Sequence, residues 1–258
     1  MSNLSGDTDI FSSERIDGGA RRAIVAFTAV RQDVFDGVYT QEHRDRIVAM
    51  FHALGEEGWT LSLRRIFDRD ADPQAHVLET GFAHDHDIAG IFEAPNMDAA
   101  LSGTVRIEQA GWARLFRTEW LIGPREFAPV PGSGAPADYR WGFIALWEWN
   151  DDWCRASARE RALYDEECDI AFQGDLELGA NIAGRHRLDL SHHWHHIGAW
   201  EIEGPEMAGR AIAGHESVAD FKFTTSRHIV GRSRPLKDLI EPRAFSRQAS
   251  LLGSTSNA

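Results

Sequence analysis

Residues 191–196 read Ser-His-His-Trp-His-His, so that four of the chain's 12 histidines flank one tryptophan, Trp194. Imidazole titrates near neutral pH, and it is also the commonest metal ligand among the side chains. A cluster of this kind can therefore perform acid/base chemistry or bind a metal ion. The apolar run 197–202 follows directly and predicts that the histidines lie in a strand, 191–202.

The alternation of side chains along a strand divides these histidines between two faces. His192 and His196 share one face with Trp194, and we predict them to be general acid/base residues in a pocket. His193 and His195 share the other face as a His-x-His pair, which could chelate a metal ion if a third ligand were supplied. The pair that faces a cavity decides between the two hypotheses.

Glu148 and a second pair of histidines extend both hypotheses. Glu148 lies in the predicted strand 141–149, next to 191–202, and could serve as a catalytic or ligating carboxylate. In the first half of the chain, His84 and His86 repeat the His-x-His spacing. Two such pairs in equivalent strands indicate either a duplicated pocket lining or a duplicated polar surface.

Tryptophans occur on the same strands as these polar residues. Packed aromatic side chains usually form core. Tryptophan alternating with histidine also gives an apolar wall with a few polar groups, which is typical of small-molecule pockets. An Arg-His pair near the end of the last predicted strand could bind an anionic group. The substrate-binding residues that we predict are Trp147, Trp149, Trp194, Trp200, Arg227 and His228.

A segment rich in proline, glycine and alanine, 128–139, divides the chain near its middle and predicts a linker. The flanking parts, 22–127 and 140–233, show the same order of strand and helix patterns. We predict a flexible N-terminus over 1–21 and a C-terminal tail over 234–258. The predicted strands are 23–30, 60–67, 84–92, 115–122, 141–149, 181–188, 191–202 and 223–230, and the predicted helices are 41–54, 98–109, 158–178 and 206–219.

Each half therefore has the order β-α-β-β-α-β, which is the ferredoxin-like unit. The sequence predicts an α+β fold in which two such repeats pack as a dimeric α/β barrel, with two four-stranded sheets face to face and the helices outside. The space between the two sheets is where we predict the pocket. The alternative is two independent domains on a linker.

The composition is that of a globular protein of 258 residues, with 43% apolar and 26% charged residues. The net charge of −13 disfavours binding to nucleic acid or to anionic membranes, because both need a basic surface. There is no pattern of a signal peptide or a membrane span. Cys154 and Cys168 are the only cysteines, so a disulfide framework is not indicated. We expect a soluble cytoplasmic protein.

Three spaced residues carry a resemblance to a known family. Trp153 precedes a predicted helix, Arg161 follows eight residues later, and Cys168 follows seven residues after that. With this spacing and the stretch 216–232, the second half resembles the C-terminal repeat of the chlorite dismutase and coproheme decarboxylase superfamily. The resemblance implies tandem ferredoxin-like repeats in a dimeric α/β barrel, and haem as the cofactor.

Cys168 occupies the position at which that family has its haem-ligating histidine. A cysteine thiolate can ligate haem, but the acidic neighbours 165–167 and Asp169 raise the pKa of a thiol. A buried, unreactive cysteine is therefore the alternative. His215, on the last predicted helix, is a second candidate haem ligand. Proteins of this fold also include cofactor-free isomerases, cyclases and monooxygenases, so catalysis does not require the axial histidine.

We therefore predict an enzyme that acts on a small aromatic or polycyclic molecule in a tryptophan- and histidine-lined barrel pocket. The predicted mechanism is histidine acid/base chemistry, with haem as the leading cofactor. One alternative is a non-catalytic protein that binds haem or another small molecule. Another is a metal-dependent enzyme that uses a His-x-His pair. The partners that we expect are a small-molecule substrate and further copies of the chain.

Overall fold

The computed structural model describes residues 22–32, 38–66, 74–124, 139–188, 190 and 193–242. The first repeat contains β1 (Ala23–Arg31), α1 (Gln41–Glu56), α2 (Leu63–Ile66), β2 (His76–Glu79), β3 (Ile88–Ala94), α3 (Met97–Ile107), the π-helical turn η1 (Glu108–Trp112), α4 (Ala113–Leu115) and β4 (Phe116–Pro124). The second contains β5 (Trp141–Trp149), α5 (Asp151–Arg155), α6 (Ala158–Glu177), β6 (Asn181–Arg187), β7 (His196–Ile202), α7 (Pro205–Glu216), α8 (Asp220–Phe223), β8 (Thr224–Pro235) and α9 (Leu236–Leu239).

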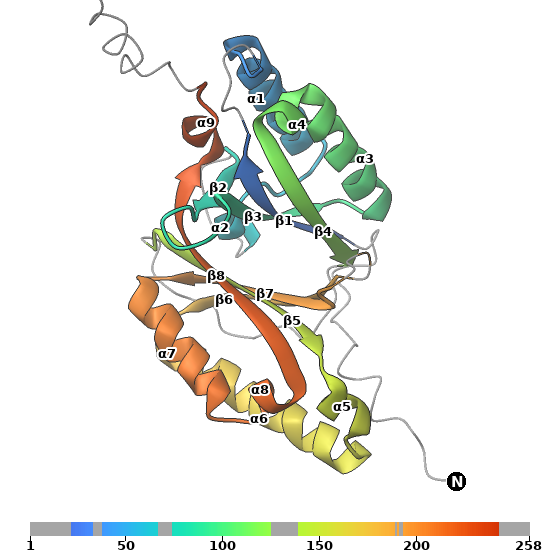
Figure 1. Cartoon of the computed structure of the whole chain (residues 1–258), viewed down its shortest axis with the longest axis vertical. Coiled ribbons are helices and arrows are strands. Elements are labelled where there is room, and N and C mark those ends of the chain that lie inside the picture. The colour runs from blue at the N-terminus through green and yellow to red at the C-terminus, as the bar shows by residue number, and fades with distance from the viewer. Residues whose placement is uncertain are drawn as a thin grey trace, which may run out of the picture.

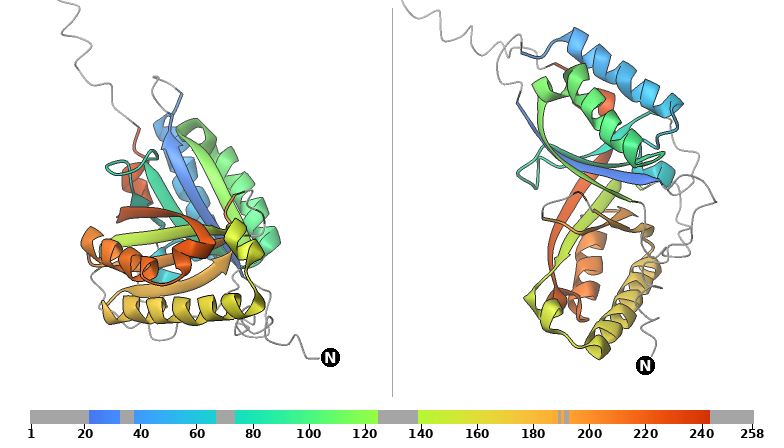
Figure 2. Two further views of the ribbon diagram at one scale, coloured as in Figure 1. Left: turned by 60° about the horizontal axis from the view of Figure 1, so that its bottom comes forward. Right: turned by 90° about the vertical axis from the view of Figure 1, so that its right-hand side faces the viewer.

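The strands of the described ranges form one antiparallel sheet in the order β4-β1-β3-β2-β8-β5-β7-β6. The strands of each repeat are contiguous in this order, and β2 pairs with β8 to join the repeats, with Leu78 opposite Ser233. The helices α1 and α3 lie at one end of the long axis, and α6 and α7 lie at the other (Figure 1). The views in Figure 2 show these helices on the outer faces of the sheet. The predicted fold, two ferredoxin-like repeats packed as a dimeric α/β barrel, is confirmed.

The edge strands of this sheet, β4 and β6, approach each other and bend the sheet towards a closed barrel. The backbone N–H of Leu190, just after β6, donates to the carbonyl of Ile122 at 3.0 Å. At Gly123 a Cβ atom would lie 2.0 Å from the carbonyl oxygen of Arg187. Such a close approach of two backbones requires glycine.

Replacing Gly123 by alanine should push β4 away from β6 and destabilise the protein by about 1–3 kcal/mol, the usual cost of overpacking. Gly174 on α6 is the matched control, because a Cβ atom there meets nothing within 4 Å and alanine favours the helix. Thermal unfolding should give a lower Tm for Gly123→Ala and an equal or higher Tm for Gly174→Ala. A Gly123→Ala protein with the parent Tm would contradict the close approach.

Aliphatic side chains fill the space between the two halves of the sheet. The buried cluster there includes Ile24 and Ile91 from the first repeat and Ile144, Leu146 and Ile229 from the second. The other two buried clusters lie on the helix-covered faces, one in each repeat. The predicted position of the pocket, between the two sheets, is therefore corrected. A cavity lined by aromatic side chains lies instead under the helices of the second repeat.

Helix α6 presents one face to the sheet, because Tyr164, Cys168 and Phe172 follow each other at four-residue spacing and are all buried. A capping box fixes where this helix begins. The Oγ of Ser157 accepts the backbone N–H of Glu160 at 3.3 Å, and the Glu160 carboxylate accepts the backbone N–H of Ser157 at 2.8 Å. Because the capping box fixes the first residue of α6, it also fixes which side chains the helix presents to the sheet.

Three predicted strands, 60–67, 84–92 and 191–202, differ from the structure. In place of a strand over 60–67, Thr60 forms one bridge to Glu93 and α2 follows, while β2 supplies the strand. His84 and His86 lie in the loop before β3. β7 begins only at His196.

The predicted C-terminal tail begins inside β8, and its next residues return to the first repeat. Leu236 and Ile240 belong to the buried cluster under α1, and the hydroxyl of Tyr39 donates to the carbonyl of Ile240 at 2.8 Å. The predicted segment 1–21 lies outside the described residues, as does all of the predicted linker except Tyr139. No helix in the described ranges is long and apolar enough to cross a membrane.

Candidate functional site

A cavity of about 450 Å³ lies between the sheet and the helices of the second repeat. Strands β5, β7 and β8 contribute to one wall, and helices α6, α7 and α8 to the other. The pleat of β5 explains this division, because alternate side chains face opposite ways. Ile144 and Leu146 belong to the barrel cluster, whereas Phe143 and Trp147 belong to the cluster under the helices and line the cavity.

Aromatic rings line both walls of the cavity. Trp149 of β5 stacks on Trp153 of α5, with 4.1 Å between ring centroids and an interplanar angle of 12°. Phe172 of α6 lies parallel to Trp200 of β7, at 5.9 Å and 8°. Flat apolar surfaces on both sides suit a planar aromatic ligand.

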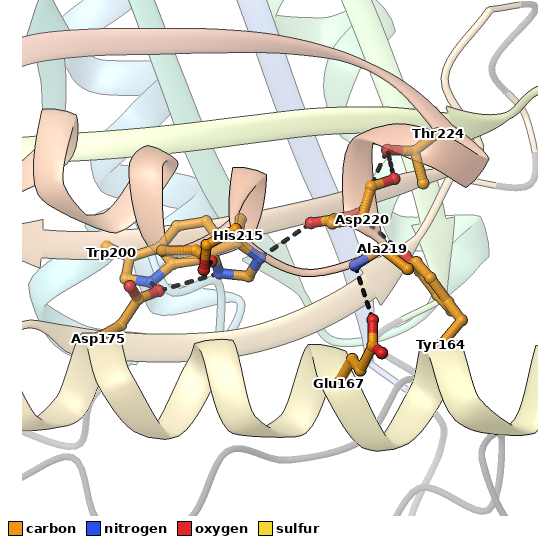
Figure 3. A network of polar contacts seen from close by, with 10 residues as sticks. Tyr164, Glu167, Asp175, Trp200, His215, Ala219, Asp220 and Thr224 are labelled. Carbon is orange, nitrogen blue, oxygen red and sulfur yellow. Dashed lines mark hydrogen bonds and ion pairs between the residues drawn. The ribbon is translucent and has the colours of Figure 1, made fainter.

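A buried network of polar contacts joins α6, α7 and α8 beside this cavity (Figure 3). The His215 ring lies between two carboxylates, with Nδ1 2.8 Å from Oδ2 of Asp220 and Nε2 3.3 Å from Oδ2 of Asp175. The indole N–H of Trp200 donates to the same oxygen of Asp175 at 2.9 Å. Burial alone would lower the pKa of His215, but the two carboxylates outweigh burial and raise the pKa to about 9. His215 is therefore an imidazolium at neutral pH, and both of its N–H groups donate.

Asp220 extends this network to the cavity wall. Its Oδ1 accepts hydrogen bonds from the hydroxyl of Tyr164 at 3.1 Å and from the hydroxyl of Thr224 at 3.2 Å. Burial raises the pKa of Tyr164, and the charge of Asp220 raises it further, so the phenol stays protonated. Tyr164, His215 and Asp220 all line the cavity. The network thus places two protonated groups, Tyr164 and His215, and one carboxylate, Asp220, at the wall of the cavity.

Cys168 lies on α6 and lines the same cavity. Burial raises the pKa of its thiol, and the charge of Asp220 adds to this effect. The group is therefore a neutral thiol at neutral pH, whereas nucleophilic attack and metal ligation require the thiolate. This chemistry agrees with the interpretation of Cys168 as a buried, unreactive cysteine.

His196 is buried at the start of β7, outside the cavity lining. Its ring stacks on Trp147 at 5.4 Å and 14°. Trp194 packs against the barrel cluster instead, since the regular pleat begins only at His196. His192 lies outside the described residues. The structure therefore does not bring together the face on which we predicted His192, Trp194 and His196.

Burial lowers the pKa of His196 to about 3, and the neighbouring His195 and Arg187 charges lower it too. The unfolded state then binds a proton first as the pH falls below about 6.5, so the stability due to neutral His196 is lost between about pH 6.5 and pH 3. Replacing His196 by phenylalanine should retain the stack on Trp147 and reduce the loss of stability between pH 6.5 and pH 4 by about 3 kcal/mol. Urea unfolding at both pH values measures this difference.

His52→Gln is the control for that series, because the His52 side chain is exposed on α1 of the first repeat and its charge does not act on His196. It should show the acid sensitivity of the parent protein. If His196→Phe loses as much stability on acidification as His52→Gln does, the neutral buried imidazole is contradicted.

The remaining predicted catalytic and metal-binding residues lie apart from the cavity. Glu148 pairs with Thr225 and shares the barrel-side face of β5 with Leu146. His193 and His195 are exposed. In the described part of the chain, no group of three or more His, Cys, Asp or Glu side chains is placed to hold a metal ion.

Arg227 and His228 are neighbours on β8 and face opposite sides of the sheet. Arg227 donates to Asp85 at 2.8 Å on the barrel side. His228 lines the cavity, with its ring 5.6 Å from the Phe143 ring and 5.7 Å from the Phe221 ring. Burial lowers the pKa of His228, so its imidazole is neutral. No hydrogen bond joins it to another residue in the described ranges.

Sequence reasoning did not identify three residues of the polar network, Tyr164, Asp175 and Asp220. Tyr164 and Asp175 lie on the face of α6 that also carries Cys168. An acidic residue on an otherwise apolar helix face was the available signal, since it indicates a buried partner. Asp220 lies 45 residues after Asp175, and nothing in the sequence pattern connects the two.

Comparison with solved structures identifies the class of fold. A mutant chlorite dismutase from Candidatus Nitrospira defluvii superposes with a TM-score of 0.61 at 13% identity, over 84% of this chain and 93% of that one. A protein described as a novel heme-binding protein from Thermus thermophilus superposes with a TM-score of 0.54 at 12% identity, over 85% and 94%. No family model and no curated protein matches the sequence. The fold is that of the chlorite dismutase-like proteins, as the resemblance in the sequence indicated.

Proposed function

We propose that the second repeat binds a planar aromatic macrocycle of the haem class between its sheet and its helices. The observation that carries this proposal is a cavity of about 450 Å³ with aromatic rings on both walls. The shared fold supports the proposal, because the structures with this fold include chlorite dismutases and a protein described as heme-binding. A haem-dependent enzyme and a haem carrier both require this binding step.

Three side chains of the cavity lining, Cys168, His215 and His228, are candidates to ligate the iron of such a ligand. The Cys168 thiol is held protonated, and both nitrogens of His215 are engaged by carboxylates. His228 lines the cavity with a neutral imidazole, which is the form that binds a metal. Among the described residues of the lining, His228 is therefore the side chain that would hold the iron.

Two guanidinium groups in the lining match the acidic side chains of a haem-class macrocycle. Arg161 lies over the Trp153 ring at 5.0 Å, and Arg185 lies over the Phe172 ring at 4.7 Å. Each would place a positive charge beside the aromatic walls. Arg185 pairs there with the exposed Asp169 carboxylate at 3.1 Å, and a carboxylate of the ligand can share that charge. When bound, haem iron would supply redox or oxygen chemistry.

A titration of the purified protein with haemin tests this proposal. We expect a saturable shift of the Soret band on addition of haemin. Metal-free protoporphyrin IX should bind more weakly, because it keeps the contacts with the aromatic walls but has no iron for His228 to hold. Ala162→Trp, at an exposed position of the cavity lining, should weaken both by about tenfold or more. Ala113→Trp, at an exposed helical position of the first repeat, is the control. Equal binding by both variants would contradict the site.

A second candidate function, cofactor-free acid/base catalysis on a small aromatic substrate, is favoured by the polar network. Tyr164 and His215 line the cavity and hold protons at defined positions against the Asp220 carboxylate. If this candidate is correct, the anionic probe anilinonaphthalene sulfonate should bind in the cavity, whereas haemin should not bind. Its affinity should fall as the pH rises through about 9, where His215 loses its positive charge. An affinity independent of pH would argue against this candidate.

A further inference from the structure

A second, smaller cavity of about 260 Å³ lies at the mouth of the barrel. It shares no lining residue with the aromatic cavity of the second repeat. Thr28 on β1 and Glu119 on β4 lie opposite each other in register, on the faces that further along carry the barrel cluster. Arg227 of β8 and His86 from the loop before β3 complete the site.

His86 is a buried side chain, 4% exposed, that lines this cavity. Its Nδ1 lies 3.1 Å from Oδ1 of Asp85, and its ring stacks on His84 at 5.2 Å and 12°. Because the carboxylate only accepts, Nδ1 carries the proton, and Nε2 of the neutral ring is an acceptor. That Nε2 is buried and has no hydrogen-bond partner among the described residues. An unsatisfied buried acceptor costs about 1–3 kcal/mol, which a ligand that donates a hydrogen bond would recover.

Two acidic and two basic side chains line the cavity around His86, and not all of them form ion pairs. Arg227 and His86 engage Asp85. Arg117 has no ion-pair partner within the described ranges, although it lines the cavity two residues from Glu119 on the same face of β4. The site therefore offers one guanidinium group as a donor, and one carboxylate and one imidazole nitrogen as acceptors.

We propose that the barrel mouth binds a small zwitterion of the amino-acid class. The ligand carboxylate would pair with Arg117, as guanidinium groups pair with carboxylates elsewhere. The ligand ammonium group would donate to Nε2 of His86 and to the carboxylate of Glu119. Such a ligand uses every unpaired group of the site and adds no net charge. The site is independent of haem-class binding in the second repeat.

NMR of the full-length protein with ¹⁵N-labelled histidine tests this proposal, with three matched probes. L-Alanine carries both charged groups, propionate lacks the ammonium group, and ethylamine lacks the carboxylate. We expect L-alanine to shift the Nε2 resonance of His86 saturably, and the other two to bind at least tenfold more weakly. No shift with any probe, or equal affinity for L-alanine and propionate, would overturn the proposal.

Arg117→Gln and Arg114→Gln form the matched pair of variants, because both arginines are exposed and Arg117 alone lines the cavity. Arg117→Gln should weaken L-alanine binding by at least tenfold, and Arg114→Gln should leave it unchanged. Equal affinities in the two variants would also overturn the proposal.

Discussion

Replacing Asp175 by asparagine should lower the free energy of unfolding by about 3–5 kcal/mol at neutral pH, the range for removing one partner of a buried ion pair. Asp175 is 1% exposed. The substitution leaves the His215 imidazolium with Asp220 as its only carboxylate and gives the Trp200 indole N–H a neutral acceptor. Urea unfolding followed by tryptophan fluorescence measures the difference.

Glu166→Gln is the matched control on the same helix. The Glu166 side chain is exposed and has no ion-pair partner among the described residues. Exposed substitutions of this kind change stability by about 0.5 kcal/mol or less, so we expect Glu166→Gln to unfold nearly as the parent protein does. Similar losses in both variants would contradict a large stabilising effect of the buried Asp175–His215 pair.

The same pair predicts how stability depends on alkaline pH. The folded-state pKa of His215 is raised from 6.5 to about 9, so the folded state keeps a proton that the unfolded state releases first. The contribution of His215, about 3 kcal/mol, is therefore complete below about pH 6.5 and lost as the pH rises through about 9. In Asp175→Asn this alkaline loss should be smaller. An identical slope in both proteins would contradict the ion pair.

Replacing His228 by alanine should weaken haemin binding by at least tenfold, which corresponds to about 1.4 kcal/mol or more. His228 lines the cavity as a neutral imidazole, and its removal takes away the nitrogen proposed to ligate the iron. Protoporphyrin IX binding should change little, because the aromatic walls remain. Absorption titrations with the two porphyrins measure the separation.

Two controls accompany His228→Ala. Added imidazole should restore the haemin spectrum, because it can occupy the space of the missing ring. Cys168→Ser should keep the parent spectrum, since the thiol is held protonated. A parent-like spectrum in His228→Ala, or its loss in Cys168→Ser, would assign the iron to the helix α6 side of the cavity.

The order of elements could be predicted because local patterns determine it. The strand 141–149 and the helix beginning at Ala158 are set by an apolar run and by the Ser157 capping box. The position of the pocket could not be predicted, because both faces of β5 are apolar. Only the size and shape of the side chains differ between them, with Ile144 and Leu146 on the barrel side and Phe143 and Trp147 on the cavity side.

The histidine cluster shows a second limit of sequence reasoning. The alternation rule requires a regular strand, but the backbone before β7 is held otherwise. The N–H of His195 donates to the Trp147 carbonyl at 3.1 Å, and the carbonyl of His195 accepts from the Leu188 N–H at 2.8 Å. Trp194 consequently lies on the barrel side, away from the face shared by His196 and Trp200. The polar network was equally hidden, because tertiary packing alone brings Asp175 to His215.

The location of iron in crystals of the protein grown with haemin tests the central proposal most directly. We expect one anomalous peak at the iron absorption edge, inside the cavity between β5, β8 and α6, at coordination distance from a ring nitrogen of His228. A peak in the barrel mouth, a peak on the protein surface, or crystals without bound iron under saturating haemin would contradict it.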